Sequence, residues 1–186
     1  MESELRNRYK NFFALTESYF SPDSVGVVES ALTLADEKLS GMMRYDGTPL
    51  LDHAVGVAMI VISEIGLGRN STISTILHDV VRLGLLDPSE AGRLFGKECT
   101  SILLVLNNIS EVDVKQDQTD NFRDLIVSYA TDPRVILIQL ADRLEVMRSL
   151  EMFPPEKRIR QSWVSLKLSA AMAHKLGLSS VNSELE

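Results

Sequence analysis

Four residues whose side chains could do chemistry lie in or beside strongly apolar segments. They are His53, the adjacent pair His78 and Asp79, and Asp142. A buried, ionised carboxylate costs several kcal/mol unless a cation or hydrogen bonds compensate for the lost hydration. Two imidazoles and two carboxylates from separate helices could offset this cost by binding one divalent ion together. Such a mixed nitrogen and oxygen set suits zinc, manganese or iron.

Each of these residues also has a simpler explanation on its own. A single core histidine is more often a hydrogen-bonded packing residue than a ligand, and Asp142 could pair with Arg143 or with an arginine of a neighbouring helix. His174, beside Lys175, is expected at the surface or as a partner of its helix's C-terminal dipole. Cys99 is the only cysteine, which excludes an intramolecular disulfide and any multi-cysteine metal site.

The elements that must position these residues are helices, because apolar residues recur at three- and four-residue steps along most of the chain. The pattern predicts helices over residues 4–20, 25–38, 51–65, 72–83, 88–95, 97–108, 121–130, 133–152 and 157–176, with a flexible loop over 110–120. No β alternation of useful length and no internal repeat occurs. The sequence therefore predicts an all-α bundle of about eight helices.

Composition narrows the class of function. The chain has 186 residues, of which 45% are hydrophobic and 24% charged, enough for one domain with a sizeable core. A formal net charge of −7 opposes broad electrostatic binding to nucleic acid. No apolar run approaches the ~18 residues of a membrane span, and the acidic N-terminus is unlike a secretory signal. We expect a globular, cytoplasmic protein with no direct DNA binding and no membrane association.

With their flanking residues, these segments resemble the HD phosphohydrolase superfamily and, within it, the RelA/SpoT homologues. The order of His53, His78-Asp79 and Asp142 is similar to the H…HD…D signature of that superfamily. The narrower similarity to RelA/SpoT homologues lies in residues 44–53 (RYDGTPLLDH), 77–81 (LHDVV), 132–144 (DPRVILIQLADRL), 147–150 (MRSL) and 173–177 (AHKLG). The resemblance covers roughly residues 25–180.

The RelA/SpoT family consists of long enzymes that make and degrade guanosine tetra- and pentaphosphate, (p)ppGpp. The resemblance implies an N-terminal helix over residues 1–24, an HD-domain helical bundle over 25–180, and the start of a linker toward a synthetase domain over 181–186. It implies one divalent ion, manganese in this family, held by His53, His78, Asp79 and Asp142. The implied partners are the guanine nucleotide and a C-terminal synthetase domain of the parent chain. We expect the nucleotide to contact Arg44, Arg82 and Arg143.

Two departures from the family pattern bear on catalysis. Active hydrolases of the family contain H-D-x-x-E-D, whose acidic pair orients or activates the attacking water, but this chain has Arg82 and Leu83 there. Arginine cannot act as a general base near neutral pH, and leucine has no lone pair. Glu145 and Val146 replace a His-Asn pair, which removes an asparagine that helps to hold the nucleotide. We therefore assign no catalytic residue and expect weak or lost 3′-pyrophosphohydrolase activity.

Two alternative functions stay open. A non-catalytic module that controls an adjoining (p)ppGpp synthetase domain would explain the loss of the acidic pair. An HD phosphohydrolase for a different nucleotide is less compatible with the flanking segments. Selectivity among nucleotide substrates would separate the second alternative from the main prediction, and coupling of pocket mutations to synthetase activity would support the first.

Overall fold

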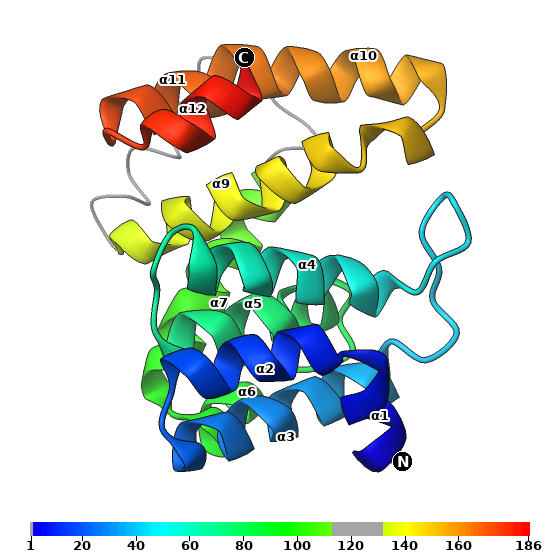
Figure 1. The fold of residues 1–186 in the computed structure, drawn as a ribbon, viewed down its shortest axis with the longest axis vertical. Helices are drawn as coiled ribbons and strands as arrows, with labels where there is room; N and C mark the ends of the chain where they lie inside the picture. The colour runs from blue at the N-terminus through cyan, green and yellow to red at the C-terminus, as the bar shows by residue number, and fades with distance from the viewer. Residues whose placement is uncertain (1, 113–131) are drawn as a thin grey trace.

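The computed structural model describes residues 2–112 and 132–186, and these residues form helices joined by loops (Figure 1). In these two stretches there are eleven α-helices and no strand, with one isolated β-bridge between Met43 and Pro49. The helices are α1 (Glu2–Arg8), α2 (Lys10–Tyr19), α3 (Pro22–Lys38), α4 (Leu50–Ser63), α5 (Arg69–Arg82), α6 (Pro88–Phe95), α7 (Lys97–Val112), α9 (Pro133–Arg148), α10 (Pro155–Val164), α11 (Ala170–Lys175) and α12 (Ser179–Leu185). The predicted all-α class is confirmed. The helix expected over 121–130 and most of the loop expected over 110–120 lie outside the described residues. Residues 110–112 of that expected loop are helical, because α7 extends to Val112 and not only to residue 108.

Three helix starts follow from local capping chemistry. The side chains of Ser21, Asp87 and Asp132 accept hydrogen bonds from the backbone N–H groups of the first turns of α3, α6 and α9. Each cap is followed at once by a proline, whose fixed φ suits the first helical position. The helix expected over 88–95 is observed with those bounds for this reason.

Three details of the helix prediction were wrong, and one of them is that the helix expected over 133–152 ends at Arg148 and is followed by a 3₁₀ turn, Leu150–Met152. The helix expected over 4–20 is broken at Tyr9, whose φ of −110° and ψ of 34° leave the helical region. The helix expected over 157–176 is α10 and α11 joined by a π-helical segment, Ser165–Ser169. Residues 181–185, placed at the start of the expected linker, are helical in α12, where Val181 and Leu185, one helical turn apart, are buried. That this segment leads to a synthetase domain stays a prediction.

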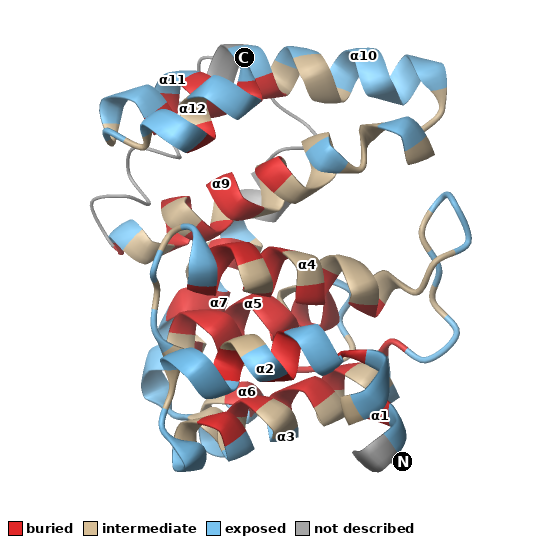
Figure 2. Cartoon of the chain, in the orientation of Figure 1, coloured by how far each residue is buried: buried red, intermediate tan, exposed pale blue. Residues whose placement is uncertain are grey.

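The interior consists of two hydrophobic clusters that share α4. One cluster contains the inward residues of α1, α2, α3 and α5, and the other those of α9, α11 and α12. Helix α4 supplies Leu51 and Ala58 to the first cluster and Val57 and Val61 to the second. Figure 2 shows the buried faces of these helices turned toward one another. The start of α4, where His53 lies, is therefore held between two packed layers.

Helix α9 packs across α4, with α10, α11 and α12 beyond it (Figure 1). Gly56 on α4 makes the close approach possible, because a Cβ there would lie 3.1 Å from Cγ of Glu145 on α9. Any larger residue at this position would push Glu145 away from the first turns of α4. This crossing brings Asp142 and Glu145 to His53.

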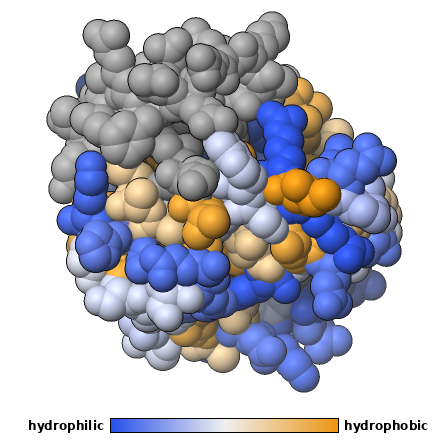
Figure 3. Space-filling view, turned by 90° about the horizontal axis from the view of Figure 1, so that it is seen from above, coloured by the Kyte–Doolittle hydropathy of each residue, from blue (hydrophilic) through white to orange (hydrophobic). Residues whose placement is uncertain are grey.

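The described surface is mixed in polarity. Seen from above, hydrophobic side chains are scattered among hydrophilic ones (Figure 3). Helix α10 contributes exposed Ile159 and Trp163, and the π-helical segment after it contributes Leu166. Within the described residues, no helix combines the length and the apolar composition needed to cross a bilayer.

Candidate functional site

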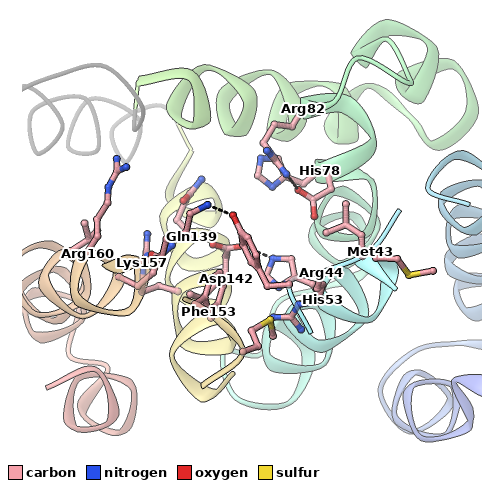
Figure 4. A pocket seen from close by; sticks show the side chains of 18 residues that line it. Met43, Arg44, His53, His78, Arg82, Gln139, Asp142, Phe153, Lys157 and Arg160 are labelled. Atoms are coloured by element: carbon pink, nitrogen blue, oxygen red, sulfur yellow. Dashed lines mark hydrogen bonds and ion pairs between the residues drawn. The ribbon is translucent and has the colours of Figure 1, made fainter. Parts of the chain in front are cut away.

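A pocket of about 660 Å³ opens where the start of α4, the end of α5, α9 and α10 meet (Figure 4). Its walls contain the four residues predicted to bind a metal and the three arginines predicted to contact the nucleotide. The lining residues are Met43, Arg44, Tyr45, Leu50, His53, His78, Asp79, Arg82, Gln139, Asp142, Arg143, Val146, Met152, Phe153, Lys157, Arg160, Gln161 and Val164. Seven residues chosen from sequence thus meet in one cavity.

His53 bridges two carboxylates on α9. Its Nε2 lies 2.9 Å from Oδ1 of Asp142, and its Nδ1 lies 2.5 Å from Oε2 of Glu145. Burial alone would lower the pKa of His53, but the hydrogen bonds and negative charges of Asp142 and Glu145 raise this pKa to about 10. A neutral imidazole can donate to only one of the two carboxylates. The imidazolium form therefore predominates near pH 7 in this arrangement.

Asp142 stays ionised for the same reason. Burial alone would raise its pKa, but the hydrogen bond and positive charge of His53 lower the pKa of Asp142 to about 2. Because efficient general bases have a pKa near the working pH, an aspartate with this pKa is a poor proton acceptor. Asp142 is suited to hold a cation instead.

His78 and Asp79 reach the pocket from the last turns of α5. Burial lowers the pKa of His78, although the charge of Asp79 acts in the opposite direction, so the neutral imidazole predominates near pH 7. The side chain of Asp79 is only 8% exposed. Its Oδ1 accepts hydrogen bonds from Nε of Arg82 at 2.9 Å and from Nη2 of Arg82 at 2.7 Å. The arginine at the position of the family's acid is thus bonded to a predicted metal ligand.

Arg44 lines the pocket and is held from behind by Glu145. Nη1 and Nη2 of Arg44 donate to the two carboxylate oxygens of Glu145 at 2.8 and 3.2 Å, and Nη2 also donates to Oγ of Ser149 at 2.8 Å. Both charged side chains are nearly buried, with exposed fractions of 11% and 12%. Sequence reasoning missed this role of Glu145. Its position three residues after Asp142, on the same face of α9, could have indicated it.

The wall formed by α10 adds positive charge that was also missed. Lys157 and Arg160 line the pocket, and Figure 4 shows them on the side opposite Arg82. The Lys157 ammonium lies 4.4 Å from the ring centroid of Tyr45, and Tyr45 packs in turn against Phe153. The basic run that follows Pro154-Pro155 was the available signal. Cations on both sides of a cavity suit a ligand with several phosphate groups.

The chemistry of the four predicted metal donors fits a divalent ion, with Nε2 of His53 releasing its proton when the ion binds. The 2.9 Å between Nε2 of His53 and Oδ1 of Asp142 is close to the ~3 Å that separates neighbouring ligands bonded at ~2.1 Å. A carboxylate on the other ring nitrogen, here Glu145, is the usual outer partner of a metal-binding histidine. Within the described parts of the chain, however, no three His, Cys, Asp or Glu side chains form a ready-made metal site. Oδ1 of Asp79, one of the predicted donor atoms, accepts hydrogen bonds from Arg82 in this arrangement.

The fold and the site define a helical domain in which α4, α5 and α9 direct two histidines and two aspartates into one pocket. The sequence profile of the HD domain matches residues 31–179. The chain therefore belongs to the HD domain family.

Two characterised relatives support the narrower resemblance to RelA/SpoT homologues. The chain is 32% identical to the guanosine-3′,5′-bis(diphosphate) 3′-pyrophosphohydrolase of Aquifex aeolicus (strain VF5), over 89% of this chain and 24% of that protein. It is 31% identical to the bifunctional (p)ppGpp synthase/hydrolase SpoT of Escherichia coli (strain K12), over 96% of this chain and 26% of that protein. The chain spans about a quarter of the length of these relatives. The resemblance to RelA/SpoT homologues is confirmed.

A solved structure has the same fold. It is that of a metazoan ortholog of SpoT, described as hydrolyzing ppGpp, with a TM-score of 0.66 and 22% sequence identity. The match covers 90% of this chain and 92% of that one. At this identity, the likeness establishes the fold of the HD domain.

Proposed function

We propose that this chain is the HD domain of a cytoplasmic RelA/SpoT-type (p)ppGpp synthetase/hydrolase and that it binds (p)ppGpp but hydrolyses it slowly or not at all. One observation carries the proposal: the pocket contains all four metal-type donors together with Arg82, where hydrolases of the family have an acid. Similarity to relatives named for (p)ppGpp hydrolysis supports the choice of nucleotide.

His53, His78, Asp79 and Asp142 are the residues that would hold a divalent ion, with manganese favoured by the family resemblance. A bound ion would polarise a phosphoryl oxygen and lower the pKa of a bound water. Glu145 holds the His53 ring in place from the side facing away from Asp142. The ring orientation needed for ligation is thus set by a residue that does not line the pocket.

Binding of the nucleotide is assigned to the cationic walls. Arg143, Lys157 and Arg160 line the pocket on the α9 and α10 side, and Arg82 lines it on the α5 side. Guanidinium groups bind phosphate oxygens through paired N–H donors. Arg44 is held by Glu145 and Ser149, so any contact that it makes with the nucleotide uses a side chain already fixed in the wall.

Slow hydrolysis follows from the state of the acidic groups. Asp79 is bound by Arg82, and Asp142 is bound by His53 with a pKa of about 2. With this pKa, Asp142 is poorly suited to accept a proton from water near pH 7. Loss of general acid–base assistance costs about 10²–10⁴-fold in rate.

Calorimetric titration with ppGpp, in excess chelator and then with Mn²⁺, tests the proposed binding. Arg143→Gln removes one pocket cation and is expected to weaken binding about tenfold, the scale of one charge-assisted hydrogen bond. Arg93→Gln is the matched control, because Arg93 lies on α6, is exposed and does not line the pocket. Absence of ppGpp binding in both conditions, or equal affinities of Arg143→Gln and wild type, would contradict the proposal.

The Arg82–Asp79 ion pair favours a second function, a non-catalytic regulatory module that controls an adjoining (p)ppGpp synthetase domain. A pocket that retains its nucleotide-binding cations without an acid–base pair can sense (p)ppGpp instead of consuming it. In the full-length protein, Arg143→Gln would then change the response of synthetase activity to added ppGpp. An unchanged response, with ppGpp binding to the HD domain lost, would rule out regulation through this pocket.

A further inference from the structure

Arg82 and Asp79 form an ion pair that contains two hydrogen bonds. Two guanidinium nitrogens, Nε and Nη2, donate to the same carboxylate oxygen, Oδ1 of Asp79. The carboxylate is 8% exposed and the arginine is 42% exposed, so the pair runs from the buried wall of the pocket to its mouth. Both residues lie in the last turns of α5, three positions apart, which fixes this geometry locally.

A guanidinium in this position opposes the binding of a divalent ion to Asp79. Oδ1 already accepts two hydrogen bonds from a fixed positive charge. An ion bound to that oxygen would lie within about 4 Å of the guanidinium, where repulsion between like charges amounts to kcal/mol even at a high effective dielectric constant. The hydrogen bonds of Arg82 must therefore break before Oδ1 can bind metal, and an ion on the other oxygen, Oδ2, would still be repelled by the guanidinium charge.

We propose that Arg82 is an internal competitor that holds Asp79 away from the metal and so lowers the affinity of the pocket for divalent ions. This inference rests on the proposed ligand set of His53, His78, Asp79 and Asp142. It assigns to Arg82 a role in setting metal affinity, which is separate from the loss of an acid for hydrolysis. The exposed guanidinium has room to leave Asp79 when an ion arrives, so binding is weakened and not abolished.

Arg143 provides the comparison that separates competition for Asp79 from a general effect of charge. It lines the same pocket and carries the same charge, but its guanidinium donates to Gln161 and not to Asp79. If Arg82 acts only by adding positive charge to the pocket, Arg143→Gln and Arg82→Gln must raise metal affinity equally. If Arg82 acts through Asp79, Arg82→Gln alone has the larger effect.

The test is binding of Mn²⁺ alone to the whole chain, measured by electron paramagnetic resonance of the free ion and by calorimetry. Arg82→Gln is expected to bind Mn²⁺ about tenfold more tightly than wild type, whereas Arg143→Gln changes the affinity less than about threefold. Arg82→Lys keeps the charge but has a single donor group, and it is expected to lie between wild type and Arg82→Gln. Far-UV circular dichroism confirms that each variant is folded.

Equal Mn²⁺ affinities of wild type and Arg82→Gln, or an equal gain in Arg143→Gln, would overturn the inference while the ligand set stands. Adding Asp142→Asn to Arg82→Gln is expected to abolish the tightened binding. Unchanged binding in that double variant, or no Mn²⁺ binding by any variant, would overturn both the ligand set and the inference. The failures of the two proposals are therefore distinguishable.

Discussion

Replacing Glu145 with glutamine removes the negative charge that lies between two buried cationic groups. The carboxylate of Glu145 contacts Nδ1 of His53 and both terminal nitrogens of Arg44. Glutamine keeps the size and one acceptor oxygen, so packing against Gly56 is preserved and the change is mainly electrostatic. We expect Glu145→Gln to destabilise the domain.

The size of this effect follows from the titration of His53. A rise of its pKa from 6.5 to about 10 corresponds to at most ~5 kcal/mol of stabilisation near neutral pH. Asp142 and Glu145 share that contribution, and the lowered pKa of Asp142, about 2, corresponds to ~2.5 kcal/mol for its own pairing with His53. The two shifts describe one set of contacts and are not added. The share of Glu145 is therefore ~2 kcal/mol, equivalent to a fall of ~4–8 °C in Tm.

The stability lost in Glu145→Gln should decrease as the pH rises. Because the folded pKa of His53 lies above the unfolded value, its stabilising contribution is complete below pH 6.5 and disappears as the pH rises through about 10. Removing the carboxylate of Glu145 lowers the pKa of His53 in the folded variant. The variant therefore has a smaller stabilising contribution from His53 to lose as the pH rises. The difference between wild type and Glu145→Gln is thus largest at pH 6–7 and shrinks toward pH 10.

Urea denaturation at pH 6, 7, 8, 9 and 10 in excess chelator, followed by circular dichroism at 222 nm, measures this difference. Glu17→Gln is the control, because Glu17 pairs with Arg6 on the exposed surface and its loss should cost less than ~1 kcal/mol. A Glu145→Gln variant as stable as wild type at pH 7 would refute the reasoning. So would a difference of equal size at pH 6 and pH 10.

Three further outcomes are expected. Gly92→Ala should destabilise the domain by ~1–3 kcal/mol in thermal melts, because the added Cβ on α6 would overlap the side chain of Thr100 on α7. A Gly92→Ala/Thr100→Ala double variant that regains none of the lost stability would contradict this. Asp132→Ala removes the N-cap of α9 and should cost ~1–2 kcal/mol in urea titrations, with an unchanged midpoint as the contrary result. Arg82→Glu combined with Leu83→Asp should raise pyrophosphate release from ppGpp by ~10²-fold, and no gain would show that another loss, such as the asparagine replaced by Val146, limits the rate.

The helical class was predictable because apolar periodicity and capping are local. Asp87, Pro88 and Gly96 mark both ends of α6 within ten residues, and the observed bounds match. Helix α12 was not predictable in this way. Its two buried residues, Val181 and Leu185, become core residues only when α9 and α11 are in place.

The site also contains some residues that could be predicted from the sequence and others that could not. His53, His78, Asp79 and Asp142 could be selected from apolar surroundings and from the family resemblance, and all four line one pocket. The pairing of Arg44 with Glu145 joins residues 101 positions apart, so no local pattern contains it. The Arg82–Asp79 pair could have been predicted from the sequence, because a spacing of three on a helix permits an ion pair.

The decisive measurement is turnover of saturating ppGpp by the wild-type domain with Mn²⁺, compared with the same assay in excess chelator. It tests whether the domain binds (p)ppGpp but hydrolyses it slowly or not at all. We expect ppGpp to bind and pyrophosphate release to stay below ~0.1 per second, which is the lower limit of common turnover numbers reduced by at least tenfold. Metal-dependent release at ~1–10³ per second, the common range for enzymes, would contradict this expectation and would mean that the four donors suffice for hydrolysis without the acidic pair.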